Sequence, residues 1–150
     1  MNEKKFALAE TELGEALGIL RKQGADHPTV AIGESWLARV YTQQGRYREA
    51  KTMLEHALPI LEMTWPDGYL VADSLYELAQ VERLEKDYAA AELAYRKAIL
   101  AYEKAGGAGS QGLEVALRQY ASLLRTNRGD EAKALERRAE GLRKSVQAFR

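Results

Sequence analysis

Only a few residues in the sequence have types and spacings that could support chemistry. Residues 107–112 read GAGSQG and match the pattern GxGxxG, whose glycines approach a dinucleotide phosphate when the motif joins a strand to a helix. Here the motif follows a helical pattern, so we interpret residues 106–112 as a flexible linker. His27 and His56 are far apart, no HExxH spacing occurs and there is no cysteine, so neither a zinc site nor a cysteine nucleophile is indicated. We therefore expect no catalytic residue, no metal site and no cofactor, and we do not expect an enzyme.

Composition and charge exclude several further classes of protein. The 150 residues include 22 Lys and Arg and 22 Asp and Glu, a formal net charge of zero, whereas nucleic-acid binders usually carry a basic excess. No apolar run approaches the roughly 18 residues of a membrane-spanning helix, and Glu10 and Glu12 interrupt the apolar stretch that a secretory signal would need. We expect a cytoplasmic protein with neither nucleic acid nor membrane as its partner.

The elements that position the polar residues follow an internal repeat. Ala9, Ala50, Ala91 and Ala132 recur at one constant interval, which sets the period of the repeat. A second set, Ala16, Ala57, Ala98 and Ala139, keeps the same interval. A period between about 20 and 50 residues indicates a repeat array, and a one-methyl side chain at these positions lets two helix backbones approach closely.

Each period predicts a helix, a tight turn and a second helix. Apolar residues such as Tyr47, Ala50, Leu54 and Ala57 recur at steps of three and four, which is one face of a helix, and Gly45 can reverse the chain. The predicted helices run over about 3–23, 29–43, 47–63, 69–85, 88–105, 113–126 and 130–148.

Three details of these helices can be predicted from single residues. Asp26 and Asp67 precede the second and fourth helices and are expected to act as their N-caps. Pro59 lies inside the third helix and is expected to kink it, because proline donates no backbone hydrogen bond.

These residues resemble the tetratricopeptide repeat family. The signature is carried in order by Leu37, Ala38, Tyr41, Gly45, Tyr47, Ala50, Leu54 and Ala57. The resemblance implies an all-α, right-handed α-solenoid of helix-turn-helix hairpins with about seven helices. It implies one domain over residues 1–150, with a half repeat at 1–24 and repeats at about 29–64, 69–105 and 113–148.

The period is longer than the ordinary repeat of this family, which is about 34 residues, and is similar to the long-repeat subclass typified by kinesin light chains. That subclass often carries a paired Asn that holds a bound peptide. Ser35 and Trp36 stand there instead, so this peptide mode is not implied. Glu34 stands where the family usually has Leu.

The resemblance also implies where a partner would bind, because the first helix of each hairpin lines a concave groove in such solenoids. The candidate partner-binding residues are Ser35, Trp36, Arg39, Gln43, Asp73, Tyr76, Gln80, Arg83, Arg118, Ser122 and Arg125. Arg forms bidentate hydrogen bonds with carboxylates, and the rigid side chains of Trp and Tyr provide contact area. We therefore hypothesise an acidic peptide or a C-terminal carboxylate as ligand. The alternative is that the arginines are solvated or paired with nearby Glu, and that Trp36 and Tyr76 cover neighbouring helices.

The two ends of the chain predict different behaviour. The last helix is polar enough to serve as a solvated cap. The first helix is half of a hairpin, so Leu13, Leu17 and Leu20 are expected to leave an apolar edge. We therefore expect either a fragment of a longer protein or self-association into a homo-oligomer through that edge. The leading hypothesis is a protein interaction scaffold, and the alternative is a structural self-assembly module.

Overall fold

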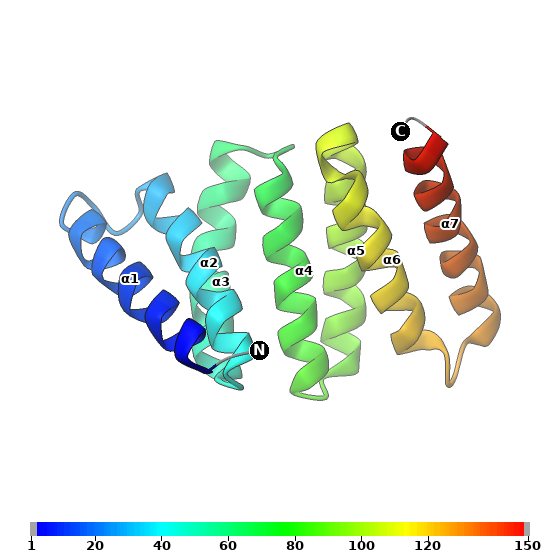
Figure 1. Ribbon diagram of the computed structural model, residues 1–150, viewed down its shortest axis with the longest axis horizontal. Helices are drawn as coiled ribbons and strands as arrows, with labels where there is room; N and C mark the ends of the chain where they lie inside the picture. The colour runs from blue at the N-terminus through cyan, green and yellow to red at the C-terminus, as the bar shows by residue number, and fades with distance from the viewer. Residues whose placement is uncertain (1–2, 149–150) are drawn as a thin grey trace. The chain divides into compact units, whose positions relative to one another are not determined.

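The computed structural model describes residues 3–148, with only the backbone described for residues 108 and 109. Every regular element in this range is helical (Figure 1). The elements are α1 Glu3–Arg21, α2 Pro28–Gln43, α3 Tyr47–Thr64, α4 Tyr69–Leu84, α5 Tyr88–Ala105, the 3₁₀ helix η1 Gly106–Gly109, α6 Ser110–Leu124 and α7 Gly129–Ala148. The prediction of an all-α helical repeat protein with seven helices is confirmed.

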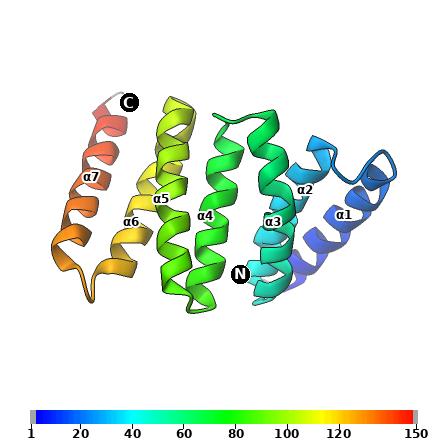
Figure 2. The same cartoon turned by 180° about the vertical axis from the view of Figure 1, so that it is seen from behind.

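The chain divides into two compact units, Met1–Pro66 and Asp67–Arg150. In the first unit α2 packs against both α1 and α3, and α3 lies behind α2 in Figure 1 and in front of it in Figure 2. In the second unit α4 packs on α5, α5 on α6 and α6 on α7, and the two first helices α4 and α6 also touch. The turns that join α4 to α5 and α6 to α7 lie at the same end of this unit (Figure 1).

The recurring alanines lie in the core, as their spacing predicts. Ala50, Ala57, Ala91, Ala98, Ala132 and Ala139 are all buried. Because each is a single methyl group on a second helix, it lets that helix approach its neighbour closely.

The turns between α2 and α3 and between α4 and α5 use a left-handed residue at the same place in the repeat. Gly45 has a φ of 75°, and Lys86, which stands one period later, has a φ of 66°. Glycine adopts this conformation freely, but a residue with a Cβ is strained there by about 1 kcal/mol. The second hairpin thus keeps the turn geometry of the first without its glycine.

The expected N-caps are wrong by one residue in both helices. Pro28 is the first residue of α2, and His27 is its cap, with Nδ1 accepting from the Thr29 backbone N–H at 3.2 Å. Proline is favoured at the first helical position because its missing N–H would be unpaired there, so Pro28 moves the cap from Asp26 to His27. In α4 the cap is Gly68, which has no side chain for this role.

Pro59 lies inside α3, as predicted, and the helix continues from Tyr47 to Thr64. The expected flexible linker at residues 106–112 is wrong, because η1 occupies residues 106–109 and α6 begins at Ser110. Gly112 therefore lies in the first turn of α6, where a Cβ would come within 2.3 Å of the Tyr102 ring. This glycine is required for close packing of α6 on α5.

Candidate functional site

In the first unit the candidate residues share the exposed face of α2. Trp36, Arg39 and Gln43 follow at steps of three and four and are exposed, whereas Leu37 and Ala38 are buried. Trp36 is 59% exposed, so most of its side chain is not covered by a neighbouring helix. Ser35 is half-buried and donates to the Ala31 carbonyl at 3.0 Å. The outward face of α2 is therefore defined by Trp36, Arg39 and Gln43.

In the second unit the α4 candidates form a hydrogen-bonded row. Arg83 Nη2 donates to Gln80 Oε1 at 2.8 Å, and Gln80 Nε2 donates to the Tyr76 hydroxyl at 2.6 Å. The fourth candidate, Asp73, instead accepts a hydrogen bond from the Tyr102 hydroxyl at 2.5 Å. The structure thus brings Tyr76, Gln80 and Arg83 together and assigns Asp73 to the packing of α5.

The α6 arginines are paired with carboxylates. Arg118 contacts Glu114 at 3.1 Å and Glu140 at 3.4 Å, and Arg125 contacts Glu136 at 2.6 Å. The alternative considered for these arginines, pairing with nearby Glu, therefore holds for both. A depression of about 550 Å³ is lined by Arg118, Arg125, Glu136, Arg137 and Glu140. Its two α6 arginines, Arg118 and Arg125, are paired with the α7 carboxylates Glu140 and Glu136.

A second depression contains two candidates of this unit, Arg83 and Ser122. It has a volume of about 420 Å³ and is lined by Arg83, Tyr88, Ser122, Leu123, Thr126 and Asn127. Sequence reasoning found Arg83 and Ser122 but missed the other four. Tyr88 occupies the repeat position of Tyr47 and Phe6, and its side chain is 55% exposed. We call these six residues the α4–α6 pocket.

A row of tyrosines connects α4, α5 and α6, with Tyr95 and Tyr120 buried and Tyr76 half-buried. The Tyr95 ring lies 6.2 Å from Tyr76 and 5.9 Å from Tyr120, measured between ring centroids. Tyr95 is fully buried, and the Arg83 side chain lies beside its hydroxyl. Loss of hydration raises the pKa of Tyr95 to about 12, and the nearby charge of Arg83 partly opposes that rise. These ring contacts pack α4, which carries Arg83, against α5 and α6.

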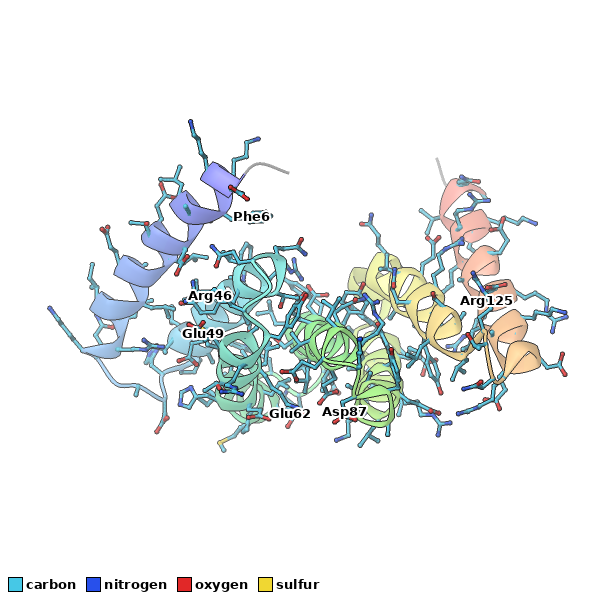
Figure 3. The ribbon with its side chains drawn as sticks, turned by 90° about the horizontal axis from the view of Figure 1, so that it is seen from below. Phe6, Arg46, Glu49, Glu62, Asp87 and Arg125 are labelled. Carbon is cyan, nitrogen blue, oxygen red and sulfur yellow. The ribbon has the colours of Figure 1, made fainter. Side chains whose placement is uncertain are left out.

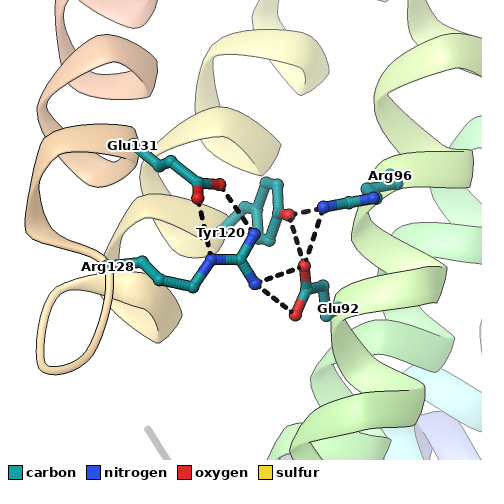
Figure 4. A network of polar contacts seen from close by, with 5 residues as sticks. All are labelled: Glu92, Arg96, Tyr120, Arg128 and Glu131. Atoms are coloured by element: carbon teal, nitrogen blue, oxygen red, sulfur yellow. Dashed lines mark hydrogen bonds and ion pairs between the residues drawn. The ribbon is translucent and has the colours of Figure 1, made fainter.

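An arginine-centred network, not predicted from the sequence, joins α5 to the turn before α7 (Figure 4). Arg128 contacts Glu92 Oε1 at 2.8 Å and Glu131 Oε2 at 2.6 Å. The Tyr120 hydroxyl donates to Glu92 at 3.0 Å and accepts from Arg96 Nε at 2.9 Å. The hydrogen bonds from Arg128 hold the pKa of the Glu92 carboxyl below its usual range. We call Glu92, Arg128 and Glu131 an arginine triad.

The same triad occurs in the first unit. Arg46 contacts Glu10 at 2.6 Å and Glu49 at 2.5 Å, and its guanidinium lies 4.0 Å above the Tyr41 ring. Figure 3 shows Arg46 and Glu49 side by side. Each member stands two repeat periods before its counterpart in the other triad. This recurrence is the signal from which the sequence could have predicted both triads.

A second polar cluster in the first unit surrounds Glu34. This buried carboxylate contacts Arg21 Nη2 at 2.9 Å and His56 Nδ1 at 2.6 Å. The other ring nitrogen of His56 contacts Asp26 at 3.2 Å. The hydrogen bond to Glu34 raises the pKa of His56, with burial opposing the rise. Since both ring nitrogens are engaged, His56 is positioned to hold α3 against α2 and the preceding loop rather than to act as a base.

The exposed edge of α1 differs from the predicted one. Leu17 is buried, because it seats directly on Gly33 of α2, while Leu13 and Leu20 are half-buried. The exposed large apolar residues of α1 are Leu8 and Ile19, at 59% and 63%.

Two comparisons with known proteins bear on this architecture. Two family models described as Tetratricopeptide repeat match the chain, one over residues 1–63 and the other over residues 72–105, together about two thirds of its length. No curated protein matches the chain. The hairpins, the buried alanines and these matches agree: the chain belongs to the tetratricopeptide repeat family.

Tetratricopeptide repeats generally serve as non-catalytic scaffolds for protein–protein interaction. Within residues 3–148 no helix has the length and apolar character needed to cross a membrane. In the same range no group of three or more His, Asp or Glu residues is arranged to hold a metal ion.

Proposed function

We propose that this protein is an interaction scaffold that binds a peptide or a partner protein on the outward face of the first helix of each hairpin. The observation that carries the proposal is the exposed Trp36 on α2, a helix whose opposite face is fully buried. Exposed aromatic residues on a rigid helix give contact area at little cost in conformational entropy. Arg39 and Gln43 add polar groups along the same face. In the second unit, the row of Tyr76, Gln80 and Arg83 supports the same role for α4.

The chain offers a matched control for this proposal, because it contains two tryptophans. Peptides are selected from a random display library on the purified protein. Their affinities are then measured for wild type, Trp36→Ala and Trp65→Ala, a variant at the exposed C-terminal end of α3. We expect Trp36→Ala to lose at least about tenfold in affinity, as for a buried interface anchor, and Trp65→Ala to bind as wild type does. Equal affinities for all three proteins would refute the use of the α2 face.

The second candidate function is self-association through α1. In α3 the stripe Ala50, Leu54, Ala57, Leu58 and Leu61 is buried, and in α5 the equivalent residues are buried too. In α1 the residues one period earlier than the α3 stripe are Ala9, Leu13, Ala16, Leu17 and Leu20, of which only Leu17 is buried. A second copy of the chain could cover this open stripe.

We rank self-association below partner binding because charge interrupts the edge of the stripe. Glu12 and Glu15 lie between Leu8 and Ile19 at helical steps and would have to be desolvated in a tight contact. Sedimentation over a concentration series tests the idea, with Ala16→Arg as the disruptive variant and Val146→Arg on exposed α7 as the control. A wild-type protein that stays monomeric, or an Ala16→Arg variant that still associates, would refute it.

A further inference from the structure

The helices α1, α3, α5 and α7 share two repeat positions that face solvent. The first position is occupied, in chain order, by Thr11, Thr52, Leu93 and Ala134. The second position, two helical turns later, is occupied by Gly18, Pro59, Leu100 and Gly141. All eight residues are exposed. Only α5 has a large apolar side chain at both positions.

The two leucines of α5 are not required by the fold. Leu93 is 56% exposed and Leu100 is 59% exposed, and the other three helices pack with threonine, alanine, glycine or proline in their place. A single exposed leucine is ordinary on a protein surface. Two leucines at the same solvent-facing place of one repeat, absent from the other copies, indicate a contact made outside the hairpin.

Two lysines lie on the same face of α5. Lys97 and Lys104 are exposed and follow Leu93 and Leu100 by four residues each. At 3.6 residues per turn, these four side chains lie within an arc of about 60° around the helix axis. We call Leu93, Lys97, Leu100 and Lys104 the α5 stripe. The helix that carries the stripe lies in front of α6 in Figure 2.

The charge of the α5 stripe is not neutralised within its unit. Both carboxylates of α5 are already paired, because Glu92 contacts Arg96 and Arg128 and Glu103 contacts Arg138. Among residues 3–148, neither Lys97 nor Lys104 takes part in an ion pair. The stripe therefore combines an apolar contact surface with two cations that remain available to a partner.

We propose that the α5 stripe binds an amphipathic helix of a partner protein that carries apolar residues seven apart and Asp or Glu beside them. Apolar residues at that spacing lie on one side of a helix and can pack against Leu93 and Leu100. The acidic residues complement Lys97 and Lys104 and fix the register of the two helices. The surface uses none of the residues assigned to the scaffold function, so it is a separate binding site.

Two other occupants match the stripe less well. A second copy of the chain, related by a two-fold axis, would set the lysines of one stripe against those of the other, and like charges repel. A lipid surface is usually bound by a helix with a broad apolar face, whereas this stripe has two leucines. An acidic helix satisfies both the leucines and the lysines.

The test selects helical peptides of about 20 residues from a display library on the purified full chain. Peptides that also bind the Leu93→Thr/Leu100→Thr variant are removed. This variant should fold, because both side chains are exposed and threonine stands at the first position in α1 and α3. We expect the remaining peptides to carry apolar residues seven apart with Asp or Glu beside them, and to bind Trp36→Ala as tightly as wild type.

A charge exchange tests the role of the lysines. Lys97→Glu/Lys104→Glu should weaken binding of the selected peptides at least about tenfold, and replacing their acidic residues with Lys should restore it. The control Lys133→Glu/Val146→Thr, at exposed positions of α7, should bind as wild type does. If no peptide survives the selection, or if the survivors are indifferent to the charge exchange, the proposal is wrong.

The other occupants give distinct results. Wild type could bind vesicles of phosphatidylcholine and phosphatidylserine, or dimerise in sedimentation experiments, and the leucine variant could lose that behaviour. Either result without selected peptides would assign the stripe to a membrane or to a second copy and overturn the partner helix. Since the selected peptides should not need Trp36, failure of the α2 face as a binding site would leave this result unchanged.

Discussion

Replacing Gly112 with alanine tests how closely α6 packs on α5. A Cβ at this position would lie 2.3 Å from Cε1 and 2.5 Å from Cζ of the Tyr102 ring, well inside the normal carbon–carbon separation of about 3.5–4.0 Å. The ring has little freedom to move, because it is buried and its hydroxyl donates to Asp73 on α4 at 2.5 Å. The added methyl group must therefore displace either Tyr102 or the start of α6.

The expected loss follows from three opposing contributions. In an open helical position, Gly to Ala stabilises by about 1 kcal/mol. Overpacking costs about 1–3 kcal/mol, and weakening the bond between Tyr102 and the Asp73 carboxylate costs about 1.5–3 kcal/mol. The two losses exceed the gain, so Gly112→Ala should lower the free energy of unfolding by about 2 kcal/mol.

Gly141 is the matched control, because it lies in α7 of the same unit and a Cβ there meets no atom within 4 Å. Urea unfolding, monitored by helical circular dichroism, compares the two alanine variants with wild type at unchanged slope. Gly141→Ala should be neutral or stabilising by up to about 1 kcal/mol. If Gly112→Ala proves as stable as Gly141→Ala, the packing argument for Gly112 is wrong.

The remaining predictions concern charge and backbone strain. The pKa of His56 is raised in the folded chain by the Glu34 hydrogen bond, so its stabilising contribution is complete below the unfolded pKa of about 6.5 and is lost as pH rises through the folded value. Urea midpoints should therefore fall between pH 6 and 8 in wild type by more than in His56→Gln, and parallel curves would contradict this. In Arg128→Gln the pKa of Glu92 should rise toward its ordinary range, because its main hydrogen-bond donor is lost; ¹³C NMR titration measures this, and an unchanged pKa would be inconsistent with the triad. Lys86→Gly should stabilise the turn before α5 by up to about 1 kcal/mol, since it relieves a φ of 66°, and a lower urea midpoint would argue against strain at Lys86.

The helices could be predicted because their signal is local. Steps of three and four between apolar residues, with alanine at fixed places in each period, define each helix and its buried face without knowledge of any distant residue. The N-cap of α2 could also have been predicted, because Pro28 fixes the helix start and so places the cap at His27.

The role of Gly112 could not be predicted from its neighbours. Its constraint comes from Tyr102 on another helix, and the surrounding glycines resemble a flexible linker in the sequence. Glu34 is similar, because a carboxylate at an apolar position is explained only by Arg21 and His56, which packing brings to it.

The candidate site was predicted in part for the same reason. The faces of α2 and α4 follow from helical periodicity, so Trp36 and Arg83 could be assigned as outward-facing residues. Pairing of Arg118 with Glu114 is readable at a spacing of four residues, but pairing of Arg125 with Glu136 depends on how α7 folds back on α6. Asn127 lines the α4–α6 pocket because of the conformation of the turn after α6. The sequence predicts that a turn occurs there, but not its conformation.

The arginine triads have a consequence for faithful assembly of the repeats. At the position that lies one period after Glu10 and one period before Glu92, the sequence has Lys51, and midway between Arg46 and Arg128 it has Asp87. In the intervening repeat the acidic position thus carries a basic residue, and the basic position carries an acidic one. A hairpin that docked one repeat out of place would set Glu10 against Asp87, or Lys51 against an arginine, and like charges would repel. The alternating charges therefore disfavour hairpins that pack against the wrong repeat during folding.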